Sequence, residues 1–356
     1  MNPSFSQLAP TVVQWQAVHG RNHLPWQQTR DPYRVWLSEI MLQQTQVTTV
    51  LGYYDRFLQR FPDVASLAAA EEDDVMALWS GLGYYSRARN LHKCAKAVME
   101  KHGGAFPPSA ALLAELPGIG RSTAAAIASF CFGERAAILD ANVKRVLTRV
   151  LGYGEDLSQS RSEKSLWTMA EDLLPTDNLS ASMPRYTQGL MDLGATICTP
   201  RNPQCLKCPL QSMCVATQEG TPEAYPVKTR KTRRSSQAWW LLIVRDEAGH
   251  LWLQKRPSTG IWAGLFATPL WADGADALNA AVQALGVSVR SEHALPAMLH
   301  VLTHRDLFLH PVLVDIAGNQ PALAGSVGAQ GAWFGPAQWA ALGLPAPVRR
   351  LLEQLV

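Results

Sequence analysis

Apolar residues recur every three or four positions through the first 220 residues, which is the spacing of helices that bury one face. The pattern is strongest over residues 31–57 and 71–102. Proline and glycine interrupt it in four short breaks, at residues 60–63, 103–109, 116–120 and 173–178. No run in this part alternates strictly between apolar and polar residues, as a half-buried strand would. The pattern therefore predicts a helical domain over residues 1–220.

The pattern changes after residue 220. Residues 221–237 hold two prolines, few apolar side chains and five basic ones. We interpret them as an exposed linker with a solvated charge run, and weak contact with phosphate is the less favoured alternative. Beyond the linker, the predicted strands are residues 238–246, 250–257 and 307–316, and the predicted helices are residues 275–285 and 346–355. The first two strands are expected to form a hairpin, and the whole indicates a compact α+β domain over residues 238–356.

Composition changes this picture little but excludes some classes of protein. A chain of 356 residues is long for one core, and 47% hydrophobic residues argue against disorder. The net charge of +3 permits an acidic partner such as nucleic acid without requiring one. No basic start followed by an apolar run marks a signal peptide, and no stretch approaches a membrane span. We therefore expect a cytoplasmic protein that does not bind membranes.

Four of the six cysteines fall close together, with the spacing C-x6-C-x2-C-x5-C. They are Cys198, Cys205, Cys208 and Cys214. Such clustering in a cytoplasmic chain indicates metal ligands, and four thiolates suit either zinc or an iron–sulfur cluster. Arg201 and Lys207 lie between the ligands, so the site would present positive charge outward, as suits a structural site beside a phosphate-binding loop. The other two, Cys94 and Cys131, lie in apolar helical patterns and are predicted to pack there.

The sequence LPGIG separates two predicted helices. Pro117 disfavours helix at the residue before it, so the first helix is expected to end at Leu116. Gly118 and Gly120 permit backbone angles that other residues avoid, and the next helix is expected to begin near Arg121. Amides at a helix start point outward, and a bare glycine backbone lets an anion approach, so this hairpin can cradle a phosphate. An ordinary tight turn between two helices explains the same residues, and only the neighbouring motifs favour the cradle.

Two carboxylic acids stand out by their positions. Asp140 precedes an amphipathic helix, so it is predicted to cap that helix, where the dipole favours the ionised carboxylate. Glu39 lies in an unusually apolar segment, where a solvated helical face shared with Gln43 and Gln46 is as good an explanation as a closed pocket. In a pocket, desolvation would raise its pKa and make it a general acid. One neutral and one ionised carboxyl group form the pattern that cleaves a glycosidic bond.

In chain order, these motifs resemble the MutY-type adenine DNA glycosylases. The wider helix-hairpin-helix superfamily, which includes endonuclease III, shares LPGIGRSTA, ILDANVKRV and the cysteine loop, whereas LQQTQ and GLGYY favour the MutY branch. The resemblance implies a mostly α helix-hairpin-helix domain with a [4Fe–4S] cluster loop, followed by a Nudix-like α+β domain. It implies a monomeric, nucleoid-associated enzyme that removes adenine mispaired with 8-oxoguanine or guanine in double-stranded DNA.

The resemblance also assigns roles to single residues. Glu39 matches the general acid that protonates the flipped adenine, Asp140 the carboxylate that stabilises the oxocarbenium-like sugar, and Asn142 its polar neighbour. The four cysteines match the [4Fe–4S] ligands. The residues that match DNA contacts are Gln44, Thr45, Tyr84, Gly118, Gly120 and Arg121. The residues that match the lining of the adenine pocket are Arg21, Leu24, Trp26 and Gln188.

The second domain departs from its fold relatives, which hydrolyse nucleotide diphosphates with a glutamate-rich helix that holds magnesium. Between Gly264 and Gly286 the only acids are Asp273 and Asp276, and there is no glutamate. A magnesium site of that kind is therefore not expected. We predict a domain that reads the lesion and is not itself an enzyme.

The lesion contacts are predicted from a loop of that domain. Where the family has Phe-Ser-His after a histidine, this chain has Leu302, Thr303 and His304 after His300. Threonine keeps a hydroxyl that can hydrogen-bond the lesion, so Thr303 and His304 are the predicted contacts. Histidines at a strand end with no such role are the alternative.

Ser122 separates two kinds of glycosylase. In superfamily members that also cut the strand, a lysine stands here and attacks the sugar. Serine cannot form a Schiff base, so we expect base removal with the strand left intact. An endonuclease III-like glycosylase and lyase is the close alternative. A catalytically silent iron–sulfur DNA-binding protein would not need Glu39 and Asp140, and the missing glutamates count against a nucleotide hydrolase.

Overall fold

The computed structural model describes residues 5–229, 234–272, 274, 288–317 and 331–355. The chain packs into two compact units. The first comprises residues 1–69 and 93–231, and the second comprises residues 70–92 and 232–356. The helical stretch 70–92, which the sequence pattern groups with the first domain, thus packs with the C-terminal residues.

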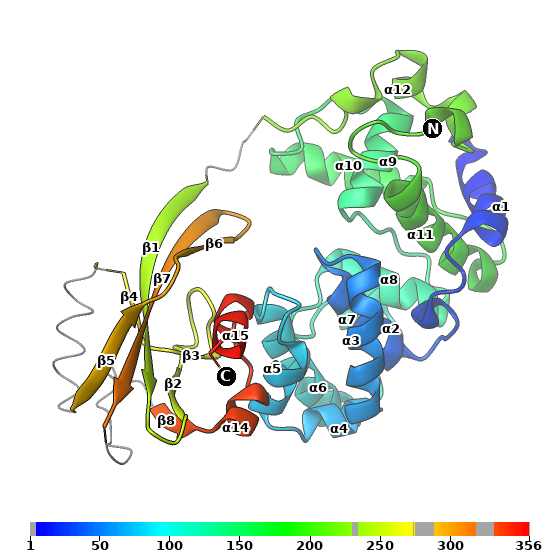
Figure 1. Cartoon of the computed structure of the whole chain (residues 1–356). Coiled ribbons are helices and arrows are strands. Elements are labelled where there is room, and N and C mark those ends of the chain that lie inside the picture. The colour runs from blue at the N-terminus through cyan, green and yellow to red at the C-terminus, as the bar shows by residue number, and fades with distance from the viewer. Residues whose placement is uncertain (1–4, 230–233, 273, 275–287, 318–330, 356) are drawn as a thin grey trace. The chain divides into compact units, whose positions relative to one another are not determined.

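The first unit is helical, as predicted, and residues 5–69 and 93–229 contain no strand (Figure 1). The helices are α1 (Leu8–His19), α2 (Pro32–Leu42), α3 (Val47–Arg60), α4 (Val64–Ala68), α6 (Ser86–His102, which begins in the second unit), α7 (Ala110–Leu113), α8 (Arg121–Phe132), α9 (Ala141–Leu151), α10 (Ser160–Asp172), α11 (Leu179–Thr196) and α12 (Val215–Gln218). Short 3-10 turns are η2 (Pro25–Gln27), η3 (Cys205–Lys207), η4 (Gln211–Met213) and η5 (Pro222–Ala224). Each of the four predicted breaks separates two of these helices.

One helix of this unit ends earlier than predicted. The pattern places its end at Leu116, but α7 ends at Leu113. The amides of Glu115 and Leu116 bond to the carbonyls three residues before them, so the chain tightens into turns ahead of the proline. The helix after the hairpin, α8, begins at Arg121 as expected.

The core of the first unit forms where α1, α9 and α11 meet. Apolar side chains from these helices, including Val12, Leu147 and Leu193, are fully buried in one cluster. In Figure 1, α1 (blue) and α11 (green) run side by side. They can approach closely because Gly189 lies at the crossing, where a Cβ would stand 2.6 Å from Cγ1 of Val12. This packing fixes α11, which contributes several polar side chains to the site.

The second unit is built around one sheet. The strands are β1 (Ser235–Arg245), β2 (Leu251–Lys255), β3 (Phe266–Ala267), β4 (Leu270–Trp271), β5 (Val289–Ala294), β6 (Met298–Val301), β7 (Arg305–Ile316) and β8 (Gly331–Phe334), and the helices are α5 (Glu72–Trp79), α14 (Pro336–Ala340) and α15 (Ala346–Glu353). The central order is β3-β2-β1-β7-β5, and β4, β6 and β8 pair with β1, β7 and β2 respectively. All three predicted strands are present, β1 and β2 pair antiparallel, and α15 matches the last predicted helix. The helix predicted over residues 275–285 lies outside the described residues.

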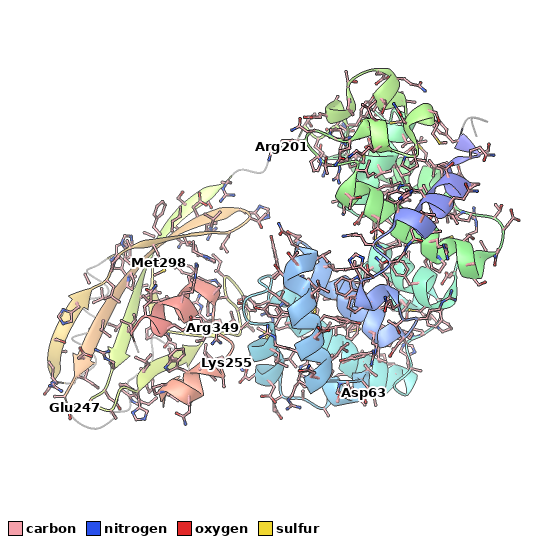
Figure 2. The ribbon with its side chains drawn as sticks, turned by 45° about the vertical axis from the view of Figure 1, so that its right-hand side comes forward. Asp63, Arg201, Glu247, Lys255, Met298 and Arg349 are labelled. Atoms are coloured by element: carbon pink, nitrogen blue, oxygen red, sulfur yellow. The ribbon has the colours of Figure 1, made fainter. Side chains whose placement is uncertain are left out.

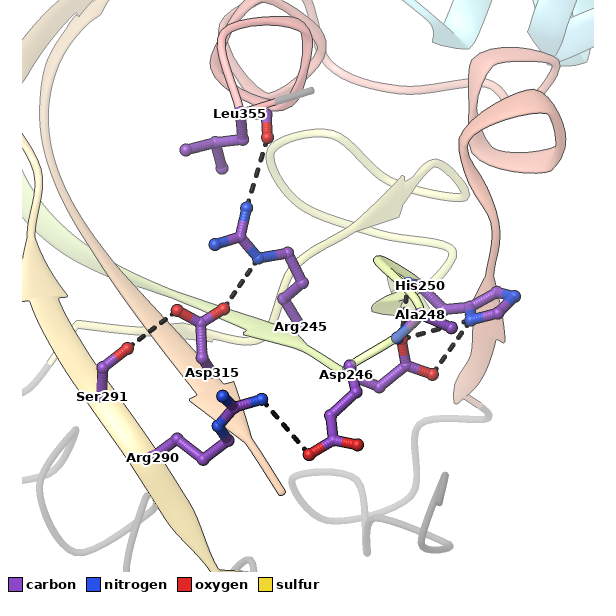
Figure 3. A network of polar contacts seen from close by, with 9 residues as sticks. Arg245, Asp246, Ala248, His250, Arg290, Ser291, Asp315 and Leu355 are labelled. Atoms are coloured by element: carbon purple, nitrogen blue, oxygen red, sulfur yellow. Dashed lines mark hydrogen bonds and ion pairs between the residues drawn. The ribbon is translucent and has the colours of Figure 1, made fainter. Parts of the chain in front are cut away.

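The longest pairing in the sheet joins β1 to β7 in parallel, from Ser235 opposite Arg305 to Arg245 opposite Asp315. A polar network lies at the end of this strand pair and joins it to neighbouring segments (Figure 3). Arg245 Nε lies 2.7 Å from Asp315, and its Nη1 donates to the Leu355 carbonyl at 3.3 Å. Ser291 of β5 donates to the same Asp315 carboxylate at 2.8 Å. The network ties three strands to the residues that follow α15, and the bond from Arg245 helps to lower the pKa of Asp315.

Residues 70–92 are held to the second unit by specific contacts. Ser80 donates to the carbonyl of Leu344 at 2.8 Å, and Gly343 packs against buried Met76 of α5. Arg89 donates to the carbonyl of Ala263 at 2.6 Å. Lys255 of β2, labelled in Figure 2, pairs with Asp73. These contacts fix the loop before α6, which carries Tyr84.

The predicted linker divides into two parts. Residues up to 229 lie against the first unit, because Leu157 donates to the Val227 carbonyl at 3.0 Å and Asp156 accepts the Thr229 amide at 3.2 Å. Residues 230–233 lie outside the described residues. Arg234, the last of the basic run, pairs with Asp306 of β7. The described residues of the predicted linker are therefore bonded to one unit or the other.

Candidate active site

Glu39 lies on the wall of a cavity of about 200 Å³ in the first unit. Two of the four predicted adenine-pocket residues, Trp26 and Gln188, line the same cavity. The other two, Arg21 and Leu24, are not part of the lining, and Leu24 is 3% exposed. The structure thus supports a position of Glu39 in a pocket and not on a solvated helix face.

The surroundings of Glu39 change its titration. It sits on α2 with its neighbours Trp36, Leu37 and Ile40 buried in the core. Burial of the carboxyl group, together with the negative charge of Asp140, raises the pKa of Glu39 to about 8. At neutral pH the group is therefore mostly protonated, which is the state that a general acid needs. The influence of Asp140 also shows that the two predicted carboxyl groups lie within electrostatic reach of each other.

Asp140 caps α9, as predicted. Its Oδ1 accepts the amide of Val143 at 2.7 Å. Burial raises the pKa of Asp140, and it outweighs the hydrogen bonds from the helix amides and the charges of Arg145 and Lys144, which lower it. The sequence prediction counted only the favourable helix terminus and missed the opposing cost of desolvation. Both carboxyl groups of the pair therefore have pKa values above the ordinary range.

Ser122, on the first turn of α8, makes a local structural contact. Its Oγ accepts the backbone amide of Leu139 at 3.0 Å. Leu139 immediately precedes Asp140, so this bond fixes the backbone that presents the carboxylate. The serine hydroxyl therefore joins α8 to the segment that carries Asp140.

Asn142 is held on the other side of the same segment. Arg145 donates to Asn142 Oδ1 at 2.8 Å and to the Gly194 carbonyl at 2.7 Å. Gly194 of α11 lets Asn142 approach, since a Cβ there would stand 2.5 Å from the Asn142 Cβ. The segment that carries Asp140 is therefore fixed by contacts to both α8 and α11.

The two hairpin glycines differ in their backbone geometry. Gly118 adopts a left-handed φ of 77°, which explains glycine there. Gly120, the N-cap of α8, has an ordinary φ of −84°, and a Cβ would meet no atom within 4 Å. The fold therefore requires glycine at one position only. Arg121, beside them, stacks on Trp167 at 3.9 Å and pairs with Glu171.

Gln44 and Thr45 lie in the turn between α2 and α3. Gln44 is exposed and has a positive φ of 56°, which is uncommon for a residue other than glycine. The Thr45 hydroxyl donates to the Gln43 carbonyl at 3.3 Å. Strained backbone of this kind is concentrated at functional sites. The geometry therefore agrees with a functional position for Gln44 but does not identify its role.

Sequence reasoning missed two residues of the cavity network. Asp192 is 1% exposed and accepts from the Arg21 amide and Nε at 2.9 Å and 2.7 Å. It also accepts from the Gln188 side chain at 2.8 Å. Gln188 and Asp192 are one helical turn apart, which is the spacing signal that could have identified the pair. Gln27 lines the cavity with both polar atoms of its buried amide unpaired, and nothing in the sequence marks it.

In the second unit, the predicted lesion contacts lie in a tight turn. Thr303 and His304 are exposed between β6 and β7. Arg234 donates to the carbonyls of Leu302 at 3.1 Å and Thr303 at 3.4 Å. The Tyr84 hydroxyl hydrogen-bonds the Thr303 hydroxyl. Two residues predicted separately, from distant parts of the chain, are thus brought together.

The residues around this turn complete its description. Tyr84 has a positive φ of 47° and is 42% exposed. His300 lies 5.9 Å from the Trp262 ring, and burial lowers its pKa. His300 is therefore a packing residue beside the turn, in contrast to the exposed His304. Asp273 and Asp276, which bear on the magnesium prediction, lie outside the described residues.

The four cysteines line one small, otherwise mostly apolar cavity next to α9. Among the described residues, no Cys, His, Asp and Glu side chains are grouped to hold a single metal ion. Four thiols around a shared cavity provide the donor set that an iron–sulfur cluster needs. Burial raises the pKa of Cys198 despite a hydrogen bond from Arg149. Arg201 and Lys207 are exposed on the loop, as expected, and Figure 2 labels Arg201.

Family models match three parts of the chain. Residues 37–172 match the HhH-GPD superfamily of base excision DNA repair proteins, and residues 239–354 match the NUDIX domain. Residues 198–214, which begin and end at a cysteine, match the iron–sulfur binding domain of endonuclease III. The cofactor is therefore a [4Fe–4S] cluster, which is one of the two alternatives that the cysteine spacing left open. No helix among the described residues is long and apolar enough to cross a membrane.

Individual relatives agree with these matches. An adenine DNA glycosylase of Buchnera aphidicola (subspecies Acyrthosiphon pisum) is 36% identical over 98% of this chain and 97% of its own length. The human adenine DNA glycosylase is 43% identical over 58% of this chain and 39% of its own. The structure of a thermostable thymine-DNA glycosylase superimposes with a TM-score of 0.54 and 30% identity, over 61% of this chain and 98% of that one. The chain therefore belongs to the adenine DNA glycosylases, base excision repair enzymes that act on DNA and hydrolyse the N-glycosidic bond.

Proposed function

We propose that this enzyme removes adenine from mispairs with 8-oxoguanine or guanine in double-stranded DNA, with Glu39 as general acid and Asp140 as the stabilising carboxylate. The observation that carries the proposal is the environment of Glu39. This residue lines a cavity, has a pKa raised to about 8, and lies within electrostatic reach of Asp140. A mostly neutral acid beside a second carboxyl group is the arrangement that glycoside cleavage uses.

The proposed reaction begins with the adenine outside the base stack, because its reacting atoms are inaccessible inside the duplex. Glu39 donates its proton to a ring nitrogen of the adenine, so that the base leaves as a neutral molecule when the C1′–N9 bond breaks. Asp140 stabilises the positive charge that develops on the sugar. Water then adds to C1′ and gives up a proton to the Glu39 carboxylate, which restores the acid and leaves a sugar without a base in an unbroken strand.

Recognition of the base is assigned to the cavity amides. The Gln188 amide nitrogen donates to Asp192 at 2.8 Å, so its carbonyl oxygen and its second N–H are left for a ligand. An amide oxygen can accept a hydrogen bond from the exocyclic amine of adenine. Gln27 has both amide atoms unpaired on the same cavity and can add a donor and an acceptor. A paired donor and acceptor is the standard way for glutamine to recognise adenine.

Recognition of the opposite base is assigned to the second unit. Thr303 and His304 are exposed at a tight turn, and Tyr84 binds the Thr303 hydroxyl. A hydroxyl pair of this kind can exchange its internal bond for bonds to an oxidised purine.

Gly118 and Gly120 are proposed to let the DNA backbone approach the start of α8, and Gly120 supports this because the fold does not need glycine there. When bound, the cluster supplies the iron–thiolate bonds that close residues 198–214 into a loop.

The proposal that the enzyme lacks efficient lyase activity depends on Ser122. A Schiff base needs an amine, and this position holds a hydroxyl that accepts the Leu139 amide. The alternative of a combined glycosylase and lyase would need another lysine at the sugar. Lys144 is the nearest candidate in sequence to Asp140, and it is paired with Glu163.

The test is a base-release assay on duplexes with a single A·8-oxoguanine, A·G or A·T pair. We expect free adenine from the first two substrates and strand breakage only after alkali treatment. Breakage without alkali would favour the combined activity. Failure to release adenine from the first two substrates, or equal release from all three, would contradict the proposed substrate.

A further inference from the structure

One arginine, Arg149 of α9, contacts both the first and the last cysteine of the cluster loop. It is 2% exposed and is among the largest fully buried side chains. Its Nη1 lies 3.3 Å from the Sγ of Cys198. Its backbone carbonyl accepts from the Sγ of Cys214 at 3.4 Å. The side chain also lines the cavity that all four cysteines share.

The remaining donors of Arg149 fix its guanidinium in place. They bind the backbone carbonyls of Thr199 at 2.7 Å, Pro200 at 3.1 Å and Tyr225 at 3.3 Å. Three bonds to main-chain atoms on both sides of the loop leave the group little freedom. The donor that faces Cys198 is therefore oriented by the fold and does not depend on the sulfur for its position.

Burying the positive charge of Arg149 costs free energy unless negative charge lies nearby. Its described contacts are neutral carbonyl oxygens and one sulfur. A buried guanidinium whose hydrogen bonds are satisfied but whose charge is unpaired is unfavourable in a protein interior. Cysteine ligands bind as thiolates, so the loop provides negative charge next to this group when the cofactor is in place. The arginine and the thiolates thus stabilise each other.

We propose that Arg149 raises the reduction potential of the cluster and slows its loss, through the hydrogen bond to the Cys198 sulfur. Hydrogen bonds to ligand sulfurs, together with net charge, set the potentials of iron–sulfur clusters. A donor and a positive charge at the sulfur stabilise the form that carries the extra electron, because that form is more negative. Arg149 acts through Cys198 and is a positioning residue. The inference goes beyond the proposed function and does not depend on which base is removed.

The experiment compares two variants of the cluster-loaded protein with a matched control. Arg149→Met removes the donors and the charge but keeps an unbranched side chain, and Arg149→Lys keeps the charge with a single donor group. The control is Glu223→Gln, because Glu223 anchors the same loop through the Asn202 amide at 2.8 Å and touches no sulfur. The measurements are the midpoint potential by protein-film voltammetry, the iron content, and the rate of absorbance loss in a chelator.

We expect the potential to fall in Arg149→Met, to fall less in Arg149→Lys, and to stay unchanged in Glu223→Gln. Cluster loss should be about 10-fold faster in Arg149→Met, which is the usual effect of removing a residue that supports a metal ligand. A wild-type potential in Arg149→Met with full iron content would overturn the proposal. An equal shift in Glu223→Gln would also overturn it, since loosening of the loop would then suffice. If Arg149→Met does not fold, the potential of Arg149→Lys decides: a lower value supports the proposal, and an unchanged value with full iron content contradicts it.

Discussion

The cavity at Glu39 and the turn at Thr303 are both predicted recognition sites, and they are built in opposite ways. The cavity has a volume of about 200 Å³, and the carboxyl group of Glu39 on its wall has a pKa raised by burial. The turn is exposed, and its shape is fixed by hydrogen bonds from the Arg234 side chain to the carbonyls of Leu302 and Thr303. The cavity changes the chemistry of its side chains, whereas the turn only orients them.

This difference follows from the two tasks. Breaking a glycosidic bond requires a proton donor that is still protonated at neutral pH. Burial, together with the charge of Asp140, provides one here by raising the pKa of Glu39. Reading a base requires donors and acceptors that a second molecule can reach. Substitutions in the cavity should therefore affect the rate of bond breakage, and substitutions at the turn should affect the choice between substrates.

The largest effect is expected from Asp140→Asn. The amide keeps the size of the side chain but removes the charge that stabilises the sugar cation, so single-turnover adenine release should fall by about 1,000-fold or more. Binding to the duplex, measured by fluorescence anisotropy, should change little. A variant that retains near-normal release would show that the carboxylate serves only as a helix cap.

Glu39→Gln should come next, with a loss of about 100-fold or more, because the amide cannot supply the proton. The pH dependence sharpens the test. Glu39 has a raised pKa of about 8, so the group is protonated below that value and loses its proton above it. The wild-type release rate should therefore decline as the pH rises through about 8, and this decline should be absent in the variant. An unchanged alkaline limb would assign it to another group.

Asp192→Asn should have a smaller effect on the cavity. The asparagine keeps one acceptor oxygen and has an amide NH2 in place of the other, so it cannot accept all three bonds from Arg21 and Gln188. We expect about a 10-fold loss of single-turnover rate with A·8-oxoguanine, in line with the loss of a charged, buried hydrogen bond. The melting temperature serves as the control. A rate loss explained fully by a fraction of unfolded protein would remove Asp192 from the site.

The smallest effect is expected at the turn. Tyr84→Phe removes one hydroxyl of the pair with Thr303 and should reduce the preference for 8-oxoguanine over guanine by about 3- to 10-fold, as one neutral hydrogen bond allows. Thr303→Val should do the same, and the double variant should lose no more than either single one. Additive losses in the double variant would mean that the two hydroxyls act separately.

Much of the cavity region was predictable from local sequence signals. Proline and glycine marked four breaks between helices of the first unit, although not the turn between α2 and α3, and the cysteine spacing marked the cluster loop. The helix cap at Asp140 followed from an acid before an amphipathic segment. These features depend on neighbours in the chain, so the sequence alone contains them.

The features that could not be predicted depend on packing between distant segments. The pKa of Asp140 rises because of burial, which no local pattern reports. Gln27 is notable only because its amide atoms are unpaired in the folded protein. The pairing of Tyr84 with Thr303 joins residues that are 219 positions apart. The helical pattern of residues 70–92 was correctly recognised, but a helical pattern does not reveal which unit it will pack with.

The packing of residues 70–92 with the second unit also has a consequence for synthesis. Met76 and Ser80 of this segment contact Gly343 and Leu344, and Ser80 and Leu344 are 264 positions apart in the chain. The segment must therefore wait, with Met76 still lacking its contact to Gly343, until residues 343 and 344 have been made. A nascent chain of this enzyme is thus most prone to aggregation between the synthesis of residues 70–92 and that of residues 343 and 344. A chain that stops before β1 stays in this aggregation-prone state.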